Sequence, residues 1–340
     1  MRYIESINNY LHSLMEKDDR VYILGEDILD PYGGAFKVTK GLSDKFPDRV
    51  MTTPISEASI TGFATGMAIA GYRPIVEIMF GDFITLCTDQ IVNGATKFKW
   101  MYGDQVNVPL VIRTPMGGRR AYGPTHSQTL ESLFFSVPGL FIIAPSNFHN
   151  PGKLLSNAVL ELNRPTLFIE NKLLYPEKLK VPINGNKIDH FFVSIIHETN
   201  KLFPTINLQL EKNIDPDVTI LSYGGIAPIA VQAALEVYLE EEILIDVLIP
   251  SLIKPFPIND ILGSVKDSGK VIIVEEGVKT SGWGAELSSL ISEHAFSFLK
   301  TPVKRIGAKE FPIPSSKILE EKVLPQLDDI KLAMLEIFEK

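Results

Sequence analysis

The stretch TTPISEASITGFATGMAIAGYRP, residues 52–74, consists almost entirely of small and apolar residues and contains a single carboxylate, Glu57. Pro54 and Ser56 are typical of a helix start, so the pattern predicts a helix over about residues 56–70. The many Gly, Ala and Thr residues and the final Arg73-Pro74 favour a buried helix over a membrane span. Glu57 is then either a surface acid favoured by the helix dipole or an acid held in a dry pocket for chemistry.

Short apolar runs alternate with helical segments on both sides of this stretch. Strands are expected at 20–27, 72–80, 108–115, 139–146 and 164–171, with a further short strand and loop at 49–57, and helices at 1–19, 83–102 and 150–162. The alternation resumes with strands at 218–225, 243–250, 270–277 and 302–308, and helices at 229–241, 284–296 and 330–340. This pattern is typical of parallel α/β sheets. We therefore expect two α/β domains, residues 1–180 and 216–340, joined by a linker with an insertion over 181–215 that can carry a short hairpin.

Composition excludes several classes of protein. The 340 residues carry a net charge of −8, which gives no electrostatic reason to expect nucleic acid or an anionic membrane as a partner. The single cysteine, Cys87, excludes an intrachain disulfide and a cysteine-rich zinc site, and it fits a reducing compartment such as the cytoplasm. The first 19 residues carry acids early, so we expect them to form an amphipathic helix and not a signal peptide.

Common nucleotide and hydrolase motifs are absent. The sequence has no G-x-x-x-x-G-K-[ST] phosphate loop, no H-E-x-x-H and no G-x-S-x-G. The nearest approach to G-x-G-x-x-G is Gly282-Trp283-Gly284, which lacks the third glycine. An α/β fold alone does not specify a reaction.

Two further passages stand out. EIMFGDFITLCTDQI (77–91) places aromatic residues beside Asp82 at a strand end, and RTPMGGRRAYGPTHSQTLESLF (113–134) brings His126 to the expected start of a helix. Loops that follow parallel strands converge at the carboxyl edge of the sheet, where α/β proteins bind ligands. Glu57 also follows a strand, so all three segments are expected to meet at one edge.

With these passages in view, the sequence resembles the β subunits of the thiamine-dependent 2-oxo acid dehydrogenases (pyruvate, branched-chain and acetoin types), relatives of transketolase. The resemblance covers nearly the whole chain. It rests on LGED (24–27), YGGAFKVTKGLSDKFPDRVMTTPISEASITG (32–62), DQIVNGATK (89–97), THSQTLESLF (125–134), GWGAEL (282–287) and FPIPSSKILEEKVLPQLDDI (311–330). It implies a pyrimidine-binding domain with a parallel sheet, followed by a transketolase C-terminal-type α/β domain.

The resemblance also implies residue roles. Glu57 matches the acid that hydrogen-bonds the pyrimidine ring of thiamine diphosphate and drives the imino tautomer that accepts the thiazolium proton. Phe83 matches the aromatic residue that packs against this ring, although a plain core aromatic is the alternative. His126 matches the active-site histidine that steadies the 2-oxo acid or guides acyl transfer to a lipoyl group. Its alternative is a loop histidine bonded to backbone.

Ions and partners follow from the same resemblance. It implies a potassium ion bound by the backbone carbonyls of Leu110, Ala158, Val159, Glu161 and Asn163. Gly-Asp-Gly, which begins the magnesium-diphosphate motif of thiamine enzymes, is absent, and FGDF (80–83) and YGDQ (102–105) both lack the final glycine. We therefore expect an α subunit that holds Mg²⁺ and the diphosphate, in an α2β2 heterotetramer. Docking on a lipoyl acyltransferase core is a further expectation, but the usual docking sequence is hard to recognise in the linker.

Three functions remain open at this point. The first is oxidative decarboxylation of a 2-oxo acid with acyl transfer to lipoamide. The second is a transketolase-like carboligase that transfers a two-carbon unit to an aldehyde. The third is a non-catalytic assembly module, against which the presence of Glu57, Phe83 and His126 argues. The sequence does not choose among the 2-oxo acids.

Overall fold

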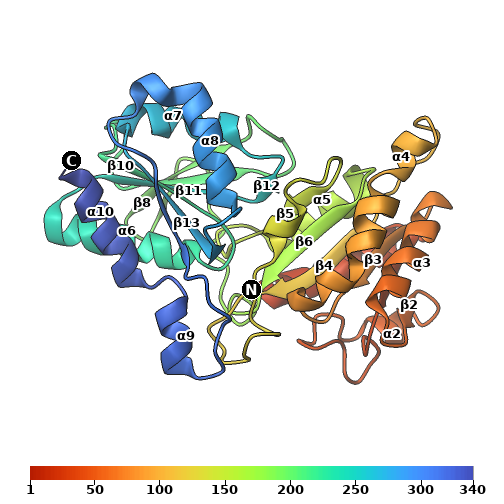
Figure 1. Ribbon diagram of the computed structural model, residues 1–340. Coiled ribbons are helices and arrows are strands. Elements are labelled where there is room, and N and C mark those ends of the chain that lie inside the picture. The colour runs from red at the N-terminus through yellow and green to blue at the C-terminus, as the bar shows by residue number, and fades with distance from the viewer. Residues whose placement is uncertain (340) are drawn as a thin grey trace.

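The computed structural model describes residues 1–339 and has two α/β halves that lie side by side (Figure 1). The strands are β1 (Val21–Gly25), β2 (Val50–Thr52), β3 (Arg73–Glu77), β4 (Val111–Met116), β5 (Phe141–Ile143), β6 (Thr166–Asn171), β7 (Lys187–Ile188), β8 (Phe191–Ile196), β9 (Thr205–Gln209), β10 (Val218–Ser222), β11 (Ile245–Pro250), β12 (Leu252–Lys254), β13 (Val271–Val278) and β14 (Lys304–Ala308). The α-helices are α1 (Tyr3–Lys17), α2 (Leu42–Lys45), α3 (Glu57–Ile69), α4 (Phe98–Met101), α5 (Pro151–Glu161), α6 (Ala227–Glu241), α7 (Ile258–Ser268), α8 (Trp283–Ala295), α9 (Lys317–Val323) and α10 (Leu327–Phe338).

The first sheet has the strand order β12-β5-β6-β4-β3-β1-β2, and its pairs are parallel except for β12 with β5. Successive residues of each central strand point to opposite faces. Ile23 of β1 and Ile75 of β3 pack with α1 and α5, whereas Leu24 and Val76 pack with α3. The near-continuous apolar runs in the sequence thus reflect a sheet that helices cover on both faces.

The second sheet has the order β14-β13-β10-β11-β9-β8-β7. Helices α6 and α10 cover one face, and α7 and α8 cover the other. Residues 181–215 contain β7, β8 and β9, which extend this sheet as antiparallel strands through the pairing of β9 with β11. Just after β11 the chain returns to the first half, where β12 pairs with β5 between the two halves (Figure 1). No helix among residues 1–339 is both long and apolar enough to cross a membrane.

The helix predicted over 83–102 is wrong in its detail. The structure has a 3₁₀ segment, η1 (Gly81–Cys87), a π-helical turn, η2 (Gln90–Ala95), and then the short α4. Threonine hydroxyls compete here with backbone N–H groups for the carbonyls that a helix would use. The Thr85 hydroxyl donates to the Asp82 carbonyl, and the Thr88 hydroxyl donates to the Thr85 carbonyl. A β-carbon on Gly81 would lie 2.2 Å from the Met116 side chain, so η1 is held close against β4. Tertiary contacts therefore override the helical pattern of the sequence.

A buried group of charges joins three neighbouring strands of the first sheet. Arg113 of β4 donates to Glu77 of β3 at 2.8 Å and to both carboxylate oxygens of Glu170 of β6, at 2.7 and 2.9 Å. The Tyr175 hydroxyl donates to Glu170 at 2.7 Å. Because each buried charge has a partner, the burial of these groups is tolerated, and the three strands are held in register.

The Gly282-Trp283-Gly284 motif has a structural explanation in the second half. The buried carboxyl of Glu275, on β13, accepts a hydrogen bond from the Gly284 N–H at 3.1 Å. A β-carbon on Gly282 or Gly284 would lie 2.3 or 2.8 Å from the Glu275 carboxylate oxygens. The two glycines therefore leave room for this acid at the start of α8. Burial raises the pKa of Glu275 to about 8.

The raised pKa of Glu275 predicts a pH-dependent stability. The folded carboxyl keeps its proton up to about pH 8, whereas an unfolded glutamate loses it near its ordinary value of 4.5. The free energy of unfolding should therefore fall as pH rises between these values. Thermal unfolding at pH 5.5 and pH 8.5 should show a larger loss of Tm for the wild type than for Glu275→Gln. Equal losses in both proteins would contradict this explanation.

Candidate active site

Three parallel strands of the first sheet, β2, β3 and β4, deliver the predicted site residues to one edge, with β1 lying between β2 and β3. Glu57 follows β2 as the first residue of α3, Phe83 lies in η1 after β3, and His126 lies in the loop after β4. Cys87 Sγ donates to the backbone carbonyl of Glu57 at 3.5 Å, which ties the end of η1 to the start of α3. At the other end of η1, the Asp82 carboxylate accepts from the side chain of Gln128 at 2.8 Å. These contacts bring all three segments together.

Glu57 is buried, with 7% of its surface exposed. Among residues 1–339, no hydrogen bond or ion pair involves its carboxylate. Buried carboxylates normally have such a partner. The carboxylate of Glu57 therefore has open hydrogen-bonding capacity.

Sequence reasoning missed a second acid beside Glu57. Glu26 directly follows β1 and is 8% exposed, and its Oε1 has no hydrogen-bond partner among the described residues. Burial, and then the charge of Glu57, raises the pKa of Glu26. The sequence did contain an indication of this role, because Glu26 lies at the end of the strand expected over 20–27, within the LGED passage. The edge of the sheet thus carries a pair of buried carboxyl groups with open hydrogen-bonding capacity.

Aromatic rings form the neighbouring wall. The imidazole of His126 lies edge-on to the ring of Phe83, with centroids 5.3 Å apart, and to the ring of Phe80 at 4.7 Å. The sequence indicated Phe80 only as one of the aromatic residues at this strand end, without a role. Phe83 and His126 are both half-buried, so one side of this group remains open. The site is therefore apolar and aromatic, with one titratable imidazole.

Lys172 is a further residue that the sequence did not reveal. It follows β6, is fully buried, and donates from Nζ to the His126 carbonyl at 2.5 Å. Its ammonium lies 5.4 Å from the centre of the Phe80 ring. Burial lowers the pKa of Lys172 to about 8. The helix expected after Gln128 is only the short 3₁₀ turn η3 (Glu131–Phe134). Because little regular secondary structure supports the loop, side-chain contacts such as the hydrogen bond from Lys172 hold it in place.

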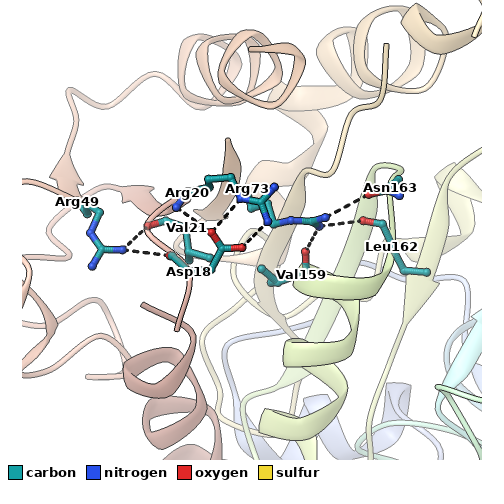
Figure 2. Close-up of polar contacts among 8 residues, drawn as sticks. All are labelled: Asp18, Arg20, Val21, Arg49, Arg73, Val159, Leu162 and Asn163. Carbon is teal, nitrogen blue, oxygen red and sulfur yellow. Dashed lines mark hydrogen bonds and ion pairs between the residues drawn. The ribbon is translucent and has the colours of Figure 1, made fainter. Parts of the chain in front are cut away.

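The carbonyls expected to hold potassium lie near the end of α5, and Figure 2 shows part of this region. Ala158, Val159 and Glu161 belong to the last four residues of α5, whose carbonyls lack helical partners. Arg73 uses one of these carbonyls, because its guanidinium donates to Val159, to the carbonyl of Leu162 at 3.5 Å and to the side chain of Asn163 at 3.3 Å. The guanidinium would repel a second cation on the Val159 oxygen.

The remaining carbonyls of that set suit a potassium ion better. The Leu110 carbonyl accepts the Thr166 N–H at 2.9 Å and keeps a second lone pair, and no hydrogen bond from Arg73 reaches Ala158, Glu161 or the Asn163 backbone. Backbone oxygens are suitable donors for a hard cation.

Comparisons with known proteins agree with this geometry. Residues 1–178 match the transketolase pyrimidine-binding domain, and residues 208–330 match the transketolase C-terminal domain. The chain is 36% identical to the pyruvate dehydrogenase E1 component subunit beta-1 of Arabidopsis thaliana, over 96% of this chain and 86% of that protein. The chain belongs to the 2-oxo acid dehydrogenase β-subunit family. The fold class predicted from the sequence is confirmed.

Other relatives place the chain within the same β-subunit family. It is 40% identical to the pyruvate dehydrogenase E1 component subunit beta of Porphyra purpurea, over 92% of this chain and 89% of that one. It is 34% identical to the acetoin:2,6-dichlorophenolindophenol oxidoreductase subunit beta of Bacillus subtilis, over 98% and 96%. The inactive β4 tetramer of a split-gene transketolase shares the fold, with a TM-score of 0.72 at 18% identity over 100% of this chain and 98% of that one.

Proposed function

We propose that this chain provides the pyrimidine half of a thiamine diphosphate site and acts with an α subunit in the oxidative decarboxylation of a 2-oxo acid. The observation that carries the proposal is the buried Glu57 carboxylate, which has no partner in the described chain. Its backbone is tied to η1, the segment in which Phe83 packs against His126. When bound, thiamine diphosphate supplies a carbon nucleophile that adds to the keto group and stabilises the charge left when carbon dioxide departs.

Each residue of the site has a role in this proposal. Glu57 holds a proton toward the ring nitrogen of the pyrimidine, and Phe83 packs against that ring. His126 steadies the carboxylate or the acyl group of the substrate, and Lys172 positions the backbone of His126. The apolar surroundings exclude water and strengthen the hydrogen bond from Glu57.

Glu57→Gln tests the role of the acid. Co-purified with its α subunit, the variant should lose about 10²–10⁴-fold in kcat for reduction of an artificial electron acceptor, because an amide cannot exchange the required proton. The exposed Glu293→Gln is the matched control and should keep full activity. Unchanged activity of Glu57→Gln in the reconstituted pair would refute the assignment.

We propose that the acyl group is transferred to a lipoyl domain. In the same reconstituted system, a lipoyl domain and an aldehyde are each added as acceptor. Formation of acyl-lipoyl product supports this proposal, whereas formation of a carboligation product only with the aldehyde supports the alternative. The curated relatives are named as components of pyruvate and acetoin enzymes, which supports a small 2-oxo acid or related compound as substrate. Docking on an acyltransferase core and residence in the cytoplasm are the remaining parts of this proposal.

The outer face of α3 supports a subunit interface. Gly62, Phe63 and Gly66 are exposed there, and a β-carbon on Gly66 would meet no atom within 4 Å. Small residues allow another backbone to approach closely. Ile55, Leu86 and Trp100 add large exposed apolar side chains in the same half. In the proposed α2β2 heterotetramer, this face contacts the α subunit, which holds Mg²⁺ and the diphosphate.

Gly66→Leu tests this interface. In the isolated chain the variant should keep or raise the Tm, because leucine favours helix and has free space at this position. With the α subunit, it should prevent heterotetramer formation in sedimentation or size-exclusion experiments. Gly263→Leu, at an exposed position of α7 that is equally free of neighbours, is the matched control. Normal assembly of Gly66→Leu would contradict the proposed interface.

Potassium is the remaining part of the proposed site. The carbonyls of Leu110, Ala158, Glu161 and Asn163 would hold the ion, while Arg73 binds Val159. The Tm should therefore be higher in potassium chloride than in choline chloride at the same ionic strength, because the ion binds only the folded chain. The same Tm in both salts would contradict this part of the proposal.

A further inference from the structure

A cavity lies beside the loop that carries His126. It has a volume of about 620 Å³, and its wall combines the loop after β4, the turn after β6 and the start of α6 in the second half of the chain. Glu57, Phe83 and His126 do not line it. Its polar wall residues include Arg119, Arg120, Asn147 and Lys172. The cavity therefore adjoins the candidate active site, because two of its wall residues, Lys172 and Tyr122, contact the ring of Phe80.

The cations of this cavity have no anionic partners. Arg120 and Lys172 lie 5.4 and 6.0 Å from the centre of the same Tyr122 ring. Arg120 donates to the Lys172 carbonyl at 3.4 Å, and Arg119 donates to the side chain of Gln326 at 3.4 Å and to the Pro325 carbonyl. Within residues 1–339, no ion pair involves any of these three cations.

Like charges around one ring repel one another unless an anion joins them. The charges of Asp82, Glu276 and Glu320 reach Lys172, but none of these acids forms an ion pair with it in the described chain. Glu320 already accepts the backbone N–H groups of Arg119 and Ala121, and Glu177 lines the cavity without an ion pair in the described chain. The cavity is thus a concentrated positive site on a chain with a net charge of −8.

Two polar groups of this wall also lack partners. Asn147 is 6% exposed and lines the cavity, and its side-chain oxygen makes no hydrogen bond with the described residues. The buried Nε of Arg119 is also unpaired. Buried polar groups of this kind usually bind a ligand, a water or an ion.

The start of α6 contributes further positive potential. Gly225 and Pro228 line the cavity at the N-terminal end of this 15-residue helix, which has no side-chain cap. The first N–H groups of a helix have no helical partners and carry partial positive charge. The guanidinium of Arg120, the nearby ammonium of Lys172 and the helix N-terminus together provide the donors and positive charge that suit a phosphate group, whereas the Asn147 side-chain oxygen is an acceptor.

We propose that this cavity binds a small organic phosphate. Arg120 and the start of α6 would hold the phosphate, the buried charge of Lys172 would attract it from behind the wall, and Asn147 would bind a polar group of the organic part. Tyr122, Leu173 and Ile229 provide an apolar wall for the rest of the molecule.

The site would also act on the loop of residues 117–126. Arg119 and Ala121 have left-handed backbone conformations, with φ of 67° and 56°, so contacts must hold this loop in place. Lys172 touches both the cavity and the His126 carbonyl. A bound phosphate would therefore order the segment that carries His126, which makes the cavity a regulatory site.

Binding is measured by calorimetry on the full chain, with glycerol 3-phosphate as the probe and with glycerol, sulfate and malonate for comparison at constant ionic strength. We expect saturable binding of glycerol 3-phosphate, none of glycerol, and weaker binding of sulfate and malonate. Arg120→Gln should lower the affinity at least tenfold, and Asn147→Ala should lower it less. Arg164→Gln removes an exposed cation that stacks on Phe141 elsewhere, and it should bind normally.

Hydrogen exchange provides a second readout, since saturating glycerol 3-phosphate should slow exchange over residues 117–126 in the wild type and not in Arg120→Gln. Absence of saturable binding, or equal affinity in Arg120→Gln and the wild type, would overturn the proposal. Loss of binding on assembly with the α subunit would overturn it too, because the cavity would then be a subunit contact. These measurements need no enzyme turnover, so they are independent of the proposed function.

Discussion

Arg113 lies in the middle of the first sheet with its guanidinium between the carboxylates of Glu77 and Glu170, and the site depends on this arrangement. Breaking a buried pair by removing one partner typically costs about 3–5 kcal/mol, since an uncompensated charge remains. The three residues belong to β4, β3 and β6. The segments that leave the ends of these strands carry His126, Phe83 and Lys172. A single buried charge cluster thus fixes the relative positions of the functional loops.

The edge of the sheet beyond this cluster has unused hydrogen-bonding capacity. Glu57 has no hydrogen-bond partner in the described chain, and Glu26 has a buried oxygen without one. A stable isolated domain would pair such acids or replace them. Their retention beside an aromatic wall and an exposed small-residue helix face fits a site that a cofactor and a second subunit complete. The same edge therefore accounts for both the proposed chemistry and the proposed partner.

The loop between β4 and η3 connects two different environments. On one side, His126 packs against Phe80 and Phe83. On the other side, Arg119 and Arg120 line a cavity that also reaches the second half of the chain. Lys172 contacts both, through the His126 carbonyl and through the wall of the cavity. Because the loop has little regular secondary structure, its conformation depends on these contacts, and a ligand on one side can influence the other.

The sequence by itself determined the alternation of strands and helices in most of the two halves, the helix that begins near Glu57, and the approach of the segments that carry Glu57, Phe83 and His126 to one edge. It did not reveal α7, α9 or the three strands β7 to β9 as such. Apolar periodicity and the rule that parallel strands end at one edge are local or topological properties, and a sequence can reveal them. The tertiary structure decided the 3₁₀ and π-helical form of residues 81–95, the return of β12 to the first sheet, and the burial of Glu26 and Lys172. These features depend on contacts between residues far apart in the chain, such as Gly81 with Met116 and Lys172 with His126, so local patterns could not predict them.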